Sequence, residues 1–141
     1  MSWKYVLAEP DLGQGEIDAV VDCLKSGWLS MGPRTQEFER AFAERHGVAH
    51  AFAVANGTAA LHIAYRAVGI GDGRADEIVQ PAMTFVASAN MTRAVGATPV
   101  FADIVALDEP TIDPDHVAAL IGPNTRAVVA MHYGGYPARM R

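Results

Sequence analysis

The feature that most constrains the fold of this sequence is an alternation, from His50 onward, of short apolar runs with segments of helix length. The apolar runs have the length of strands and cover residues 51–55, 77–80, 99–102 and 126–131. Helical spacing of apolar side chains marks residues 58–68, residues 84–95 and a short segment opened by Asp113-Pro114. Because the runs are apolar on both faces, they predict buried parallel strands. The alternation therefore predicts an α/β fold of stacked βαβ units around a mostly parallel sheet.

Residues 1–47 follow a different pattern, which predicts two amphipathic helices. In the first helix, apolar side chains recur at helical period on Ile17, Val20, Val21 and Leu24. This helix ends at Ser26-Gly27, and the second begins at Gly32-Pro33 and ends at Gly47. We therefore predict a boundary after residue 47.

The composition of the chain argues against several classes of function. With 141 residues, half of them hydrophobic, the chain can bury a core of ordinary single-domain size. Its net charge is -5 and it has no basic run, which argues against nucleic acid as a partner. The one cysteine, Cys23, can form no internal disulfide, and no apolar run reaches membrane-spanning length. From these two observations we expect a cytoplasmic protein that does not bind a membrane. The histidines are scattered along the chain, so we also expect no metal site.

The turn Asn56-Gly57-Thr58 follows the first predicted strand and opens the next predicted helix. In an open α/β sheet, ligands bind outside the carboxyl ends of the strands, where this turn would lie. A helix start presents free backbone N–H groups, the glycine permits close approach and the threonine adds a hydroxyl, so the turn suits a bound phosphate. An ordinary threonine N-cap behind a turn glycine explains the same residues. The residues alone leave both interpretations open.

Two further side chains follow predicted strands, and each has a functional and a structural interpretation. Phe85 lies near the start of a predicted helix, where its ring can stack on a planar heteroaromatic ligand or pack in the core. His132 follows the last predicted strand, and its ring can face the ligand crevice or make a structural hydrogen bond. No serine lies in a Gly-x-Ser-x-Gly turn, so the sequence does not support a hydrolase triad.

Five segments of the chain occur together, in the same order, in one known family. They are SGWLSMGP at 26–33, VANGTAALH at 54–62, PAMTFVASAN at 81–90, GATPVFAD at 96–103 and HYG at 132–134. By these segments the chain resembles the sugar aminotransferases named after the DegT, DnrJ, EryC and StrS proteins, a branch of the fold type I pyridoxal-phosphate enzymes. The resemblance implies a three-layer α/β/α fold that corresponds to the N-terminal part of the large domain of such an enzyme.

The resemblance also implies a binding site for pyridoxal 5'-phosphate. Gly57, Thr58 and Ala59 match family residues that cradle the cofactor phosphate at a helix N-terminus. Phe85 matches the aromatic residue that stacks on the pyridine ring. The resemblance therefore favours the functional interpretation both of the turn and of this ring.

For the substrate, the resemblance implicates Trp28, whose loop is similar to the family segment near the nucleotide sugar, and Thr84, which lies beside the cofactor aromatic. Residues 1–47 then form a helical segment with the substrate-side loop, and residues 48–141 form a partial pyridoxal-phosphate-binding α/β domain. The implied reaction transfers an amino group, from glutamate, to a keto group of a nucleotide-linked sugar, in a homodimer. Sugar dehydration, or aromatisation of an amino-cyclohexenone precursor, is an alternative with the same cofactor. A truncated or diverged non-enzymatic regulatory or binding protein is an alternative of another class.

The chain departs from the family in its lysines. In the family, the lysine that forms the Schiff base and the aspartate that pairs with the pyridine nitrogen both lie beyond the segment equivalent to Arg141. The only lysines here, Lys4 and Lys25, do not match that position, and Lys25 ends a predicted helix where a cation is favourable. We therefore assign no catalytic residue and expect no covalent attachment of the cofactor through this chain.

Overall fold

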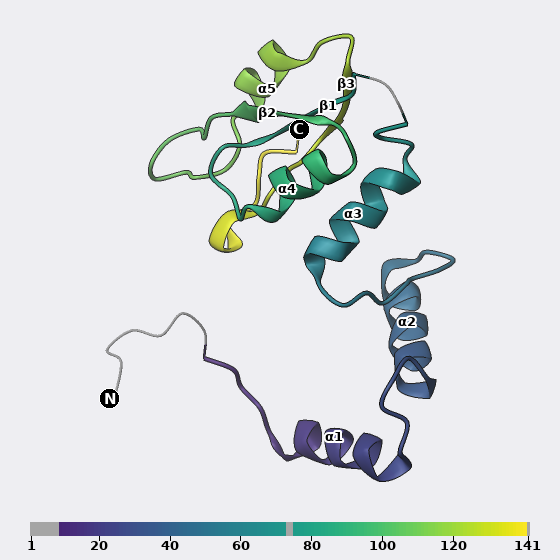
Figure 1. Ribbon diagram of the computed structural model, residues 1–141. Coiled ribbons are helices and arrows are strands. Elements are labelled where there is room, and N and C mark those ends of the chain that lie inside the picture. Colours follow the sequence, from purple (N-terminus) through teal and green to yellow (C-terminus); the bar gives the residue numbers. More distant parts are fainter. Residues whose placement is uncertain (1–8, 73–74, 141) are drawn as a thin grey trace. The chain divides into compact units, whose positions relative to one another are not determined.

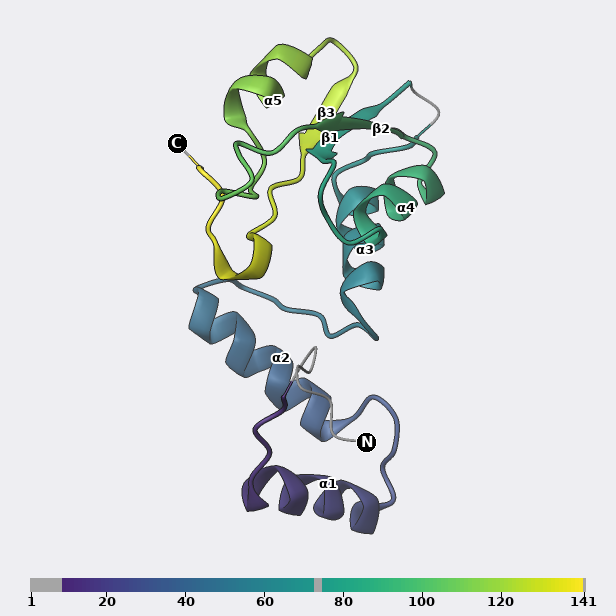
Figure 2. The ribbon, with the colours of Figure 1, turned by 90° about the vertical axis from the view of Figure 1, so that its left-hand side faces the viewer.

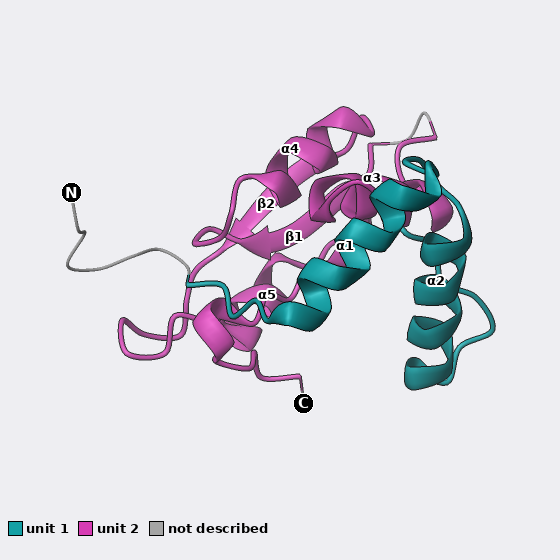
Figure 3. Ribbon diagram, turned by 90° about the horizontal axis from the view of Figure 1, so that it is seen from below, with its two compact units in different colours: residues 1–53 teal, residues 54–141 magenta. Residues whose placement is uncertain are grey.

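The computed structural model describes residues 9–72 and 75–140 (Figure 1). The chain divides into two compact units, Met1–Ala53 and Val54–Arg141, which Figure 3 distinguishes by colour. None of the helices in the described part is both long and apolar enough to cross a bilayer. The sequence predicts a boundary after residue 47, between a segment with the substrate-side loop and a cofactor-binding domain. This functional division stays a prediction.

Unit 1 contains the two helices that its apolar spacing and glycines predict, α1 (Gln14–Ser26) and α2 (Pro33–His46). Each helix stops at a glycine with positive φ: Gly27 at 71° and Gly47 at 63°. This left-handed conformation is common at helix ends and is strained for other residues. The start of α1 is fixed by Glu16, whose Oε2 accepts the Gly13 N–H at 2.8 Å. The apolar stripe of α1 is exposed, so unit 1 owes its shape mainly to local contacts.

Unit 2 is built around a parallel sheet of three strands. Its elements in chain order are α3 (Gly57–Ala67), β1 (Glu77–Pro81), α4 (Ala87–Ala94), β2 (Thr98–Ala102), α5 (Pro114–Leu120), β3 (Thr125–Val128) and the 3-10 turn η1 (Tyr133–Gly135). The strand order is β2-β1-β3, with Glu77 of β1 opposite Thr98 and Thr125. The chain therefore crosses from β1 to β2 on one side and returns past β1 to β3.

Alternating side chains of β1 face the two sides of the sheet, so one strand contributes to two cores. Ile78 packs with Tyr65 and Val95 against α3 and α4, whereas Val79 packs with Ile112 on the side of α5. Figure 2 shows α3 and α4 on one face of the sheet and α5 on the other. This arrangement confirms the predicted three-layer α/β/α fold.

A close approach of two loops holds α3 beside α4. Gly71 has φ 86°, and a Cβ atom there would lie 1.7 Å from the Val95 carbonyl oxygen. The Gly71 N–H donates to Asp76 Oδ2 at 2.9 Å, and Asp76 Oδ1 pairs with Arg126 Nε at 3.0 Å. Asp76 is buried at the entrance to β1, so this contact joins the turn after α3 to β3.

Three predictions about secondary structure need correction. Residues 51–55 are not a strand, because a strand needs a partner for its backbone and no described segment pairs with them. The helix predicted at 84–95 begins only at Ala87, which leaves Phe85 in the preceding turn. Only β1 is buried on both faces, since β2 and β3 are edge strands and are partly exposed.

Candidate ligand-binding site

A hollow of about 580 Å³ lies at the carboxyl ends of β1 and β3, and we call it the strand-end cavity. Its lining comes from the starts of α3 and α4 and from the segments that follow the two strands, including Val129 and Met131. The crossover helices after β1 and β2 lie on opposite faces of the sheet, which makes this edge a topological switch point. Ligands of open α/β folds bind at such points.

The turn before α3 contributes backbone donors to the strand-end cavity. The N–H groups of Gly57 and Thr58 have no acceptor among the described residues, and both residues line the cavity. A Cβ atom built on Gly57 would meet nothing within 4 Å, so the side of this residue is open as well. An anion can therefore approach both N–H groups.

The cap of α3 is Asn56 and not the threonine that the sequence suggested as a structural alternative. Asn56 Oδ1 accepts the Ala59 N–H at 2.9 Å, and the Asn56 carbonyl accepts the Ala60 N–H at 3.1 Å. The Ala59 N–H thus already has an acceptor, whereas the N–H groups of Gly57 and Thr58 have none among the described residues. Contact of Ala59 with a phosphate stays a prediction.

Phe85 lines the same cavity as Gly57 and Thr58, although 27 positions separate Phe85 from Thr58 in the chain. Its side chain is 72% exposed, so it does not pack in either core. The ring is therefore available to a planar ligand, and the structural interpretation of this residue is not supported.

The hydroxyl of Thr84 bonds within the protein. Thr84 Oγ1 donates to Met131 Sδ at 2.6 Å and so joins the segment after β1 to the segment after β3. This contact fixes the position of the turn that carries Phe85. A role for Thr84 in substrate binding stays a prediction.

The start of α4 adds a residue that the sequence analysis did not single out. Ser88 lines the strand-end cavity and is 4% exposed, and its Oγ has no hydrogen-bond partner among the described residues. No side chain caps this helix. The sequence shows only that Ser88 follows Phe85 by three positions, which does not reveal that its hydroxyl is buried and unpaired.

No charged side chain belongs to the lining of the strand-end cavity among the described residues. Among the described residues, the groups there that can attract an anion are therefore the starts of α3 and α4. A helix N-terminus stabilises a negative charge by about 0.3–1 kcal/mol, so an anion there depends mainly on hydrogen bonds.

Trp28 lies in unit 1, where it organises the loop between α1 and α2. Its Nε1–H donates to the Met31 carbonyl at 2.9 Å, and its N–H donates to Ser26 Oγ at 3.1 Å. The indole lies directly on Gly32, because a Cβ atom at that position would be 2.0 Å from Nε1. The loop is therefore built around this one aromatic side chain.

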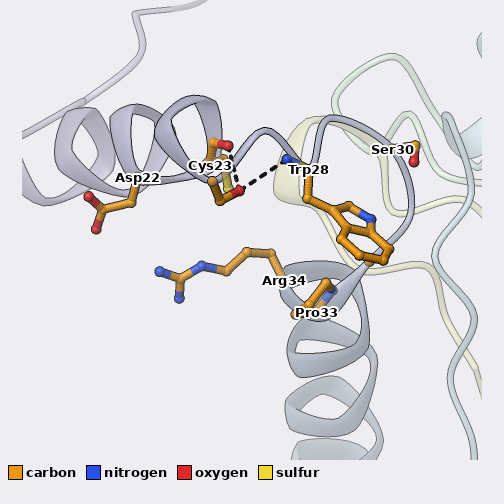
Figure 4. A pocket seen from close by; sticks show the side chains of 8 residues that line it. Asp22, Cys23, Trp28, Ser30, Pro33 and Arg34 are labelled. Atoms are coloured by element: carbon orange, nitrogen blue, oxygen red, sulfur yellow. Dashed lines mark hydrogen bonds between the residues drawn. The ribbon is translucent and has the colours of Figure 1, made fainter.

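A second hollow, of about 240 Å³, lies beside this loop, and we call it the Trp28 pocket. Figure 4 shows Asp22 and Arg34 on its two sides with the Trp28 indole at one end. Trp28 is 58% exposed, so part of its ring is free. The role of Trp28 beside a sugar substrate stays a prediction.

His132 and Asp103, which follow predicted strands, both make local structural contacts. His132 Nδ1 accepts the Ala138 N–H at 3.0 Å, and this histidine does not line the strand-end cavity. The Asp103 carboxylate accepts the Ile104 N–H at 2.8 Å. For His132 the structure favours the structural interpretation.

The sequence matches the DegT/DnrJ/EryC1/StrS aminotransferase family over residues 10–141. The structure is similar to Helicobacter pylori PseC, an aminotransferase involved in the biosynthesis of pseudoaminic acid, with a TM-score of 0.85, 35% identity and coverage of 95% of this chain and 36% of PseC. It is also similar to S. venezuelae DesV in complex with a ketimine intermediate, with a TM-score of 0.79, 40% identity and coverage of 90% of this chain and 34% of DesV.

A third similar structure, from Streptococcus pneumoniae, is a protein described as a sugar aminotransferase and solved in its PLP form. Here the TM-score is 0.83 and the identity 32%, with coverage of 95% of this chain and 33% of the other. The chain thus spans about a third of the length of these solved proteins. Both the sequence match and the shared architecture show that the chain belongs to the DegT/DnrJ/EryC1/StrS aminotransferase family.

Proposed function

We propose that the chain forms part of a pyridoxal-phosphate-dependent aminotransferase that acts on a nucleotide-linked keto sugar, with glutamate as amino donor. One observation carries the proposal: the unpaired N–H groups of Gly57 and Thr58 and the exposed ring of Phe85 border one cavity. Membership of the family supports the reaction class.

The residues of the strand-end cavity fit the two parts of this cofactor, a dianionic phosphate ester and a flat pyridine ring. The start of α3 binds the phosphate through Gly57 and Thr58. Phe85 orients the ring by stacking, while Leu61 and Val129 provide an apolar wall that excludes water. When bound, the cofactor supplies an electron sink for negative charge on the substrate carbon.

This chain supplies binding residues rather than the group that moves the proton. Lys25 lies in the last turn of α1 in unit 1, where a cation meets the helix dipole, and Lys4 lies outside the described residues. Neither lysine matches the Schiff-base position of the family. The proposal therefore assigns no residue of this chain to proton transfer.

The substrate side of the proposal rests on residues 1–47. The half-free indole of Trp28 offers a flat surface to a nucleobase, and Arg34 offers a cation to a diphosphate. Thr84 is proposed as a further substrate contact beside the ring of Phe85. The resemblance supports glutamate as the donor and a homodimer as the assembly. The sequence supports a cytoplasmic location, and both support the division into residues 1–47 and 48–141.

The experiment uses the protein expressed from its complete open reading frame. Calorimetric titration should show binding of pyridoxal 5'-phosphate. With the cofactor, glutamate and a nucleotide-linked keto sugar present, the protein should then release 2-oxoglutarate as it transfers the amino group to the sugar. Phe85→Leu should weaken cofactor binding by about twofold to tenfold, because stacking beyond simple burial is worth roughly 0.5–1.5 kcal/mol. Phe101→Leu is the matched control, since this half-exposed ring lies in β2 and does not line the cavity. Absence of cofactor binding by the unaltered protein would end the proposal.

A further inference from the structure

The helices α3 and α4 begin at the same end of unit 2. Leu61 and Tyr65 of α3 pack in one core with Met91 and the α4 cap residue Val95, so the two helices lie side by side in the same direction (Figures 1 and 2). Both starts line the strand-end cavity. Two helix N-termini, each with positive potential, therefore border one site.

The start of α4 carries donors that the rest of the described chain does not use. The N–H groups of Ala87 and Ser88 have no acceptor among the described residues, and neither does Ser88 Oγ–H. Both residues are buried and line the cavity. Buried polar groups in proteins are almost always paired, so an unpaired hydroxyl at a cavity indicates a missing partner.

Thr92, one turn further along α4, shows how the same helix satisfies a buried hydroxyl when no ligand is involved. Its Oγ1 donates to the Ser88 carbonyl at 2.8 Å and lies 3.4 Å from Gln80 Oε1. Thr92 does not line the strand-end cavity. The Thr92 hydroxyl is thus paired within the protein and lies away from the cavity, whereas the Ser88 hydroxyl lines the cavity and has no partner among the described residues.

Resting on the function proposed above, we propose that Ser88 and the start of α4 form a second anion-binding arm, so that the cofactor phosphate is held between the N-termini of α3 and α4. Ser88 Oγ–H donates a hydrogen bond to a phosphate oxygen. A dianion needs several donors at a site whose described lining has no cation, and Gly57 and Thr58 supply only part of them. The ligand class is a phosphate monoester.

The test compares pyridoxal 5'-phosphate with pyridoxal, which lacks the phosphate, by calorimetric titration of the protein from its complete reading frame. Ser88→Ala should bind pyridoxal 5'-phosphate at least about tenfold more weakly, the loss expected for a hydrogen bond to a charged group. Pyridoxal binding should change less than twofold. The melting temperature of the ligand-free variant should stay level or rise, since the substitution removes an unpaired buried hydroxyl.

Thr92→Val is the matched control, because it removes a paired buried hydroxyl from the same helix. It should lower the melting temperature and leave the preference for pyridoxal 5'-phosphate over pyridoxal intact. The inference is overturned if Ser88→Ala keeps that preference, if it weakens both ligands equally, or if it lowers the ligand-free melting temperature as Thr92→Val does. If the unaltered protein binds no pyridoxal 5'-phosphate, the proposed function itself fails, which is a separate outcome.

Discussion

The Trp28 pocket and the strand-end cavity are built in opposite ways. The Trp28 pocket is lined only by residues between Asp22 and Arg34, so a short stretch of chain forms it. The strand-end cavity is lined by residues from Asn56 to Met131, which only the parallel sheet brings together. The first hollow therefore depends on local contacts and the second on the packing of the whole of unit 2.

The linings differ as well. The Trp28 pocket carries Asp22 and Arg34 at its sides, whereas the strand-end cavity has no charged side chain among the described residues. Charged side chains in an exposed pocket keep most of their hydration, whereas the donors of Ala87 and Ser88 at the start of α4 are buried. Substitutions that disturb packing should thus affect the strand-end cavity far more than the Trp28 pocket.

Glycines of positive φ in the two units give the largest expected contrast. Gly27→Ala, in unit 1, should cost about 1–2 kcal/mol, because a Cβ atom there is strained but meets nothing within 4 Å. Gly71→Ala, in unit 2, should cost about 3 kcal/mol or more, since overpacking against the Val95 carbonyl adds to that strain. Denaturant unfolding followed by circular dichroism measures both values. Equal losses would contradict the distinction between local and long-range construction.

Trp28→Phe should have a smaller effect that stays within unit 1. The phenyl ring still covers Gly32, but the hydrogen bond from Nε1 to the Met31 carbonyl is lost. A net hydrogen bond is worth about 0.5–1.5 kcal/mol, so stability should fall by that amount. Leu29→Ala is the control, because Leu29 is an exposed neighbour in the same loop. If Trp28→Phe matched Gly71→Ala in cost, the loop would not be a local structure.

The same contrast explains what the sequence could predict. The ends of α1 and α2 were predictable because Gly27 and Gly47 act within their own turn. The strands β1, β2 and β3 were predictable as apolar runs of the right length. Residues 51–55 have an equally apolar sequence, but a strand also requires a partner, and nothing in the run itself encodes one.

In the strand-end cavity, the sequence and the resemblance located Gly57, Thr58 and Phe85 but gave no warning of Ser88. The first three follow a recognisable turn or strand end, so their place at the sheet edge follows from topology. The burial of Ser88 depends on how α3 packs beside α4, which involves residues some 30 positions apart. Likewise, Asn56 and Thr58 are both favourable cap residues by type, and the backbone geometry makes Asn56 the cap.

The smallest expected effect concerns Tyr65 in the interior of unit 2. Burial raises the pKa of Tyr65 above its ordinary value of about 10, and the nearby Thr92 hydroxyl offsets part of the rise. Because the folded state holds this proton more tightly than the unfolded state, the stability is complete below pH 10 and falls as the pH rises further. Tyr65→Phe cannot ionise, so its free energy of unfolding should decline less than that of the unaltered protein above pH 10. Tyr136→Phe, at an exposed site, should decline in parallel with the unaltered protein. Parallel curves for Tyr65→Phe as well would show that this side chain is solvated, and that the packing of α3 on α4, which buries it, is looser than the structure has it.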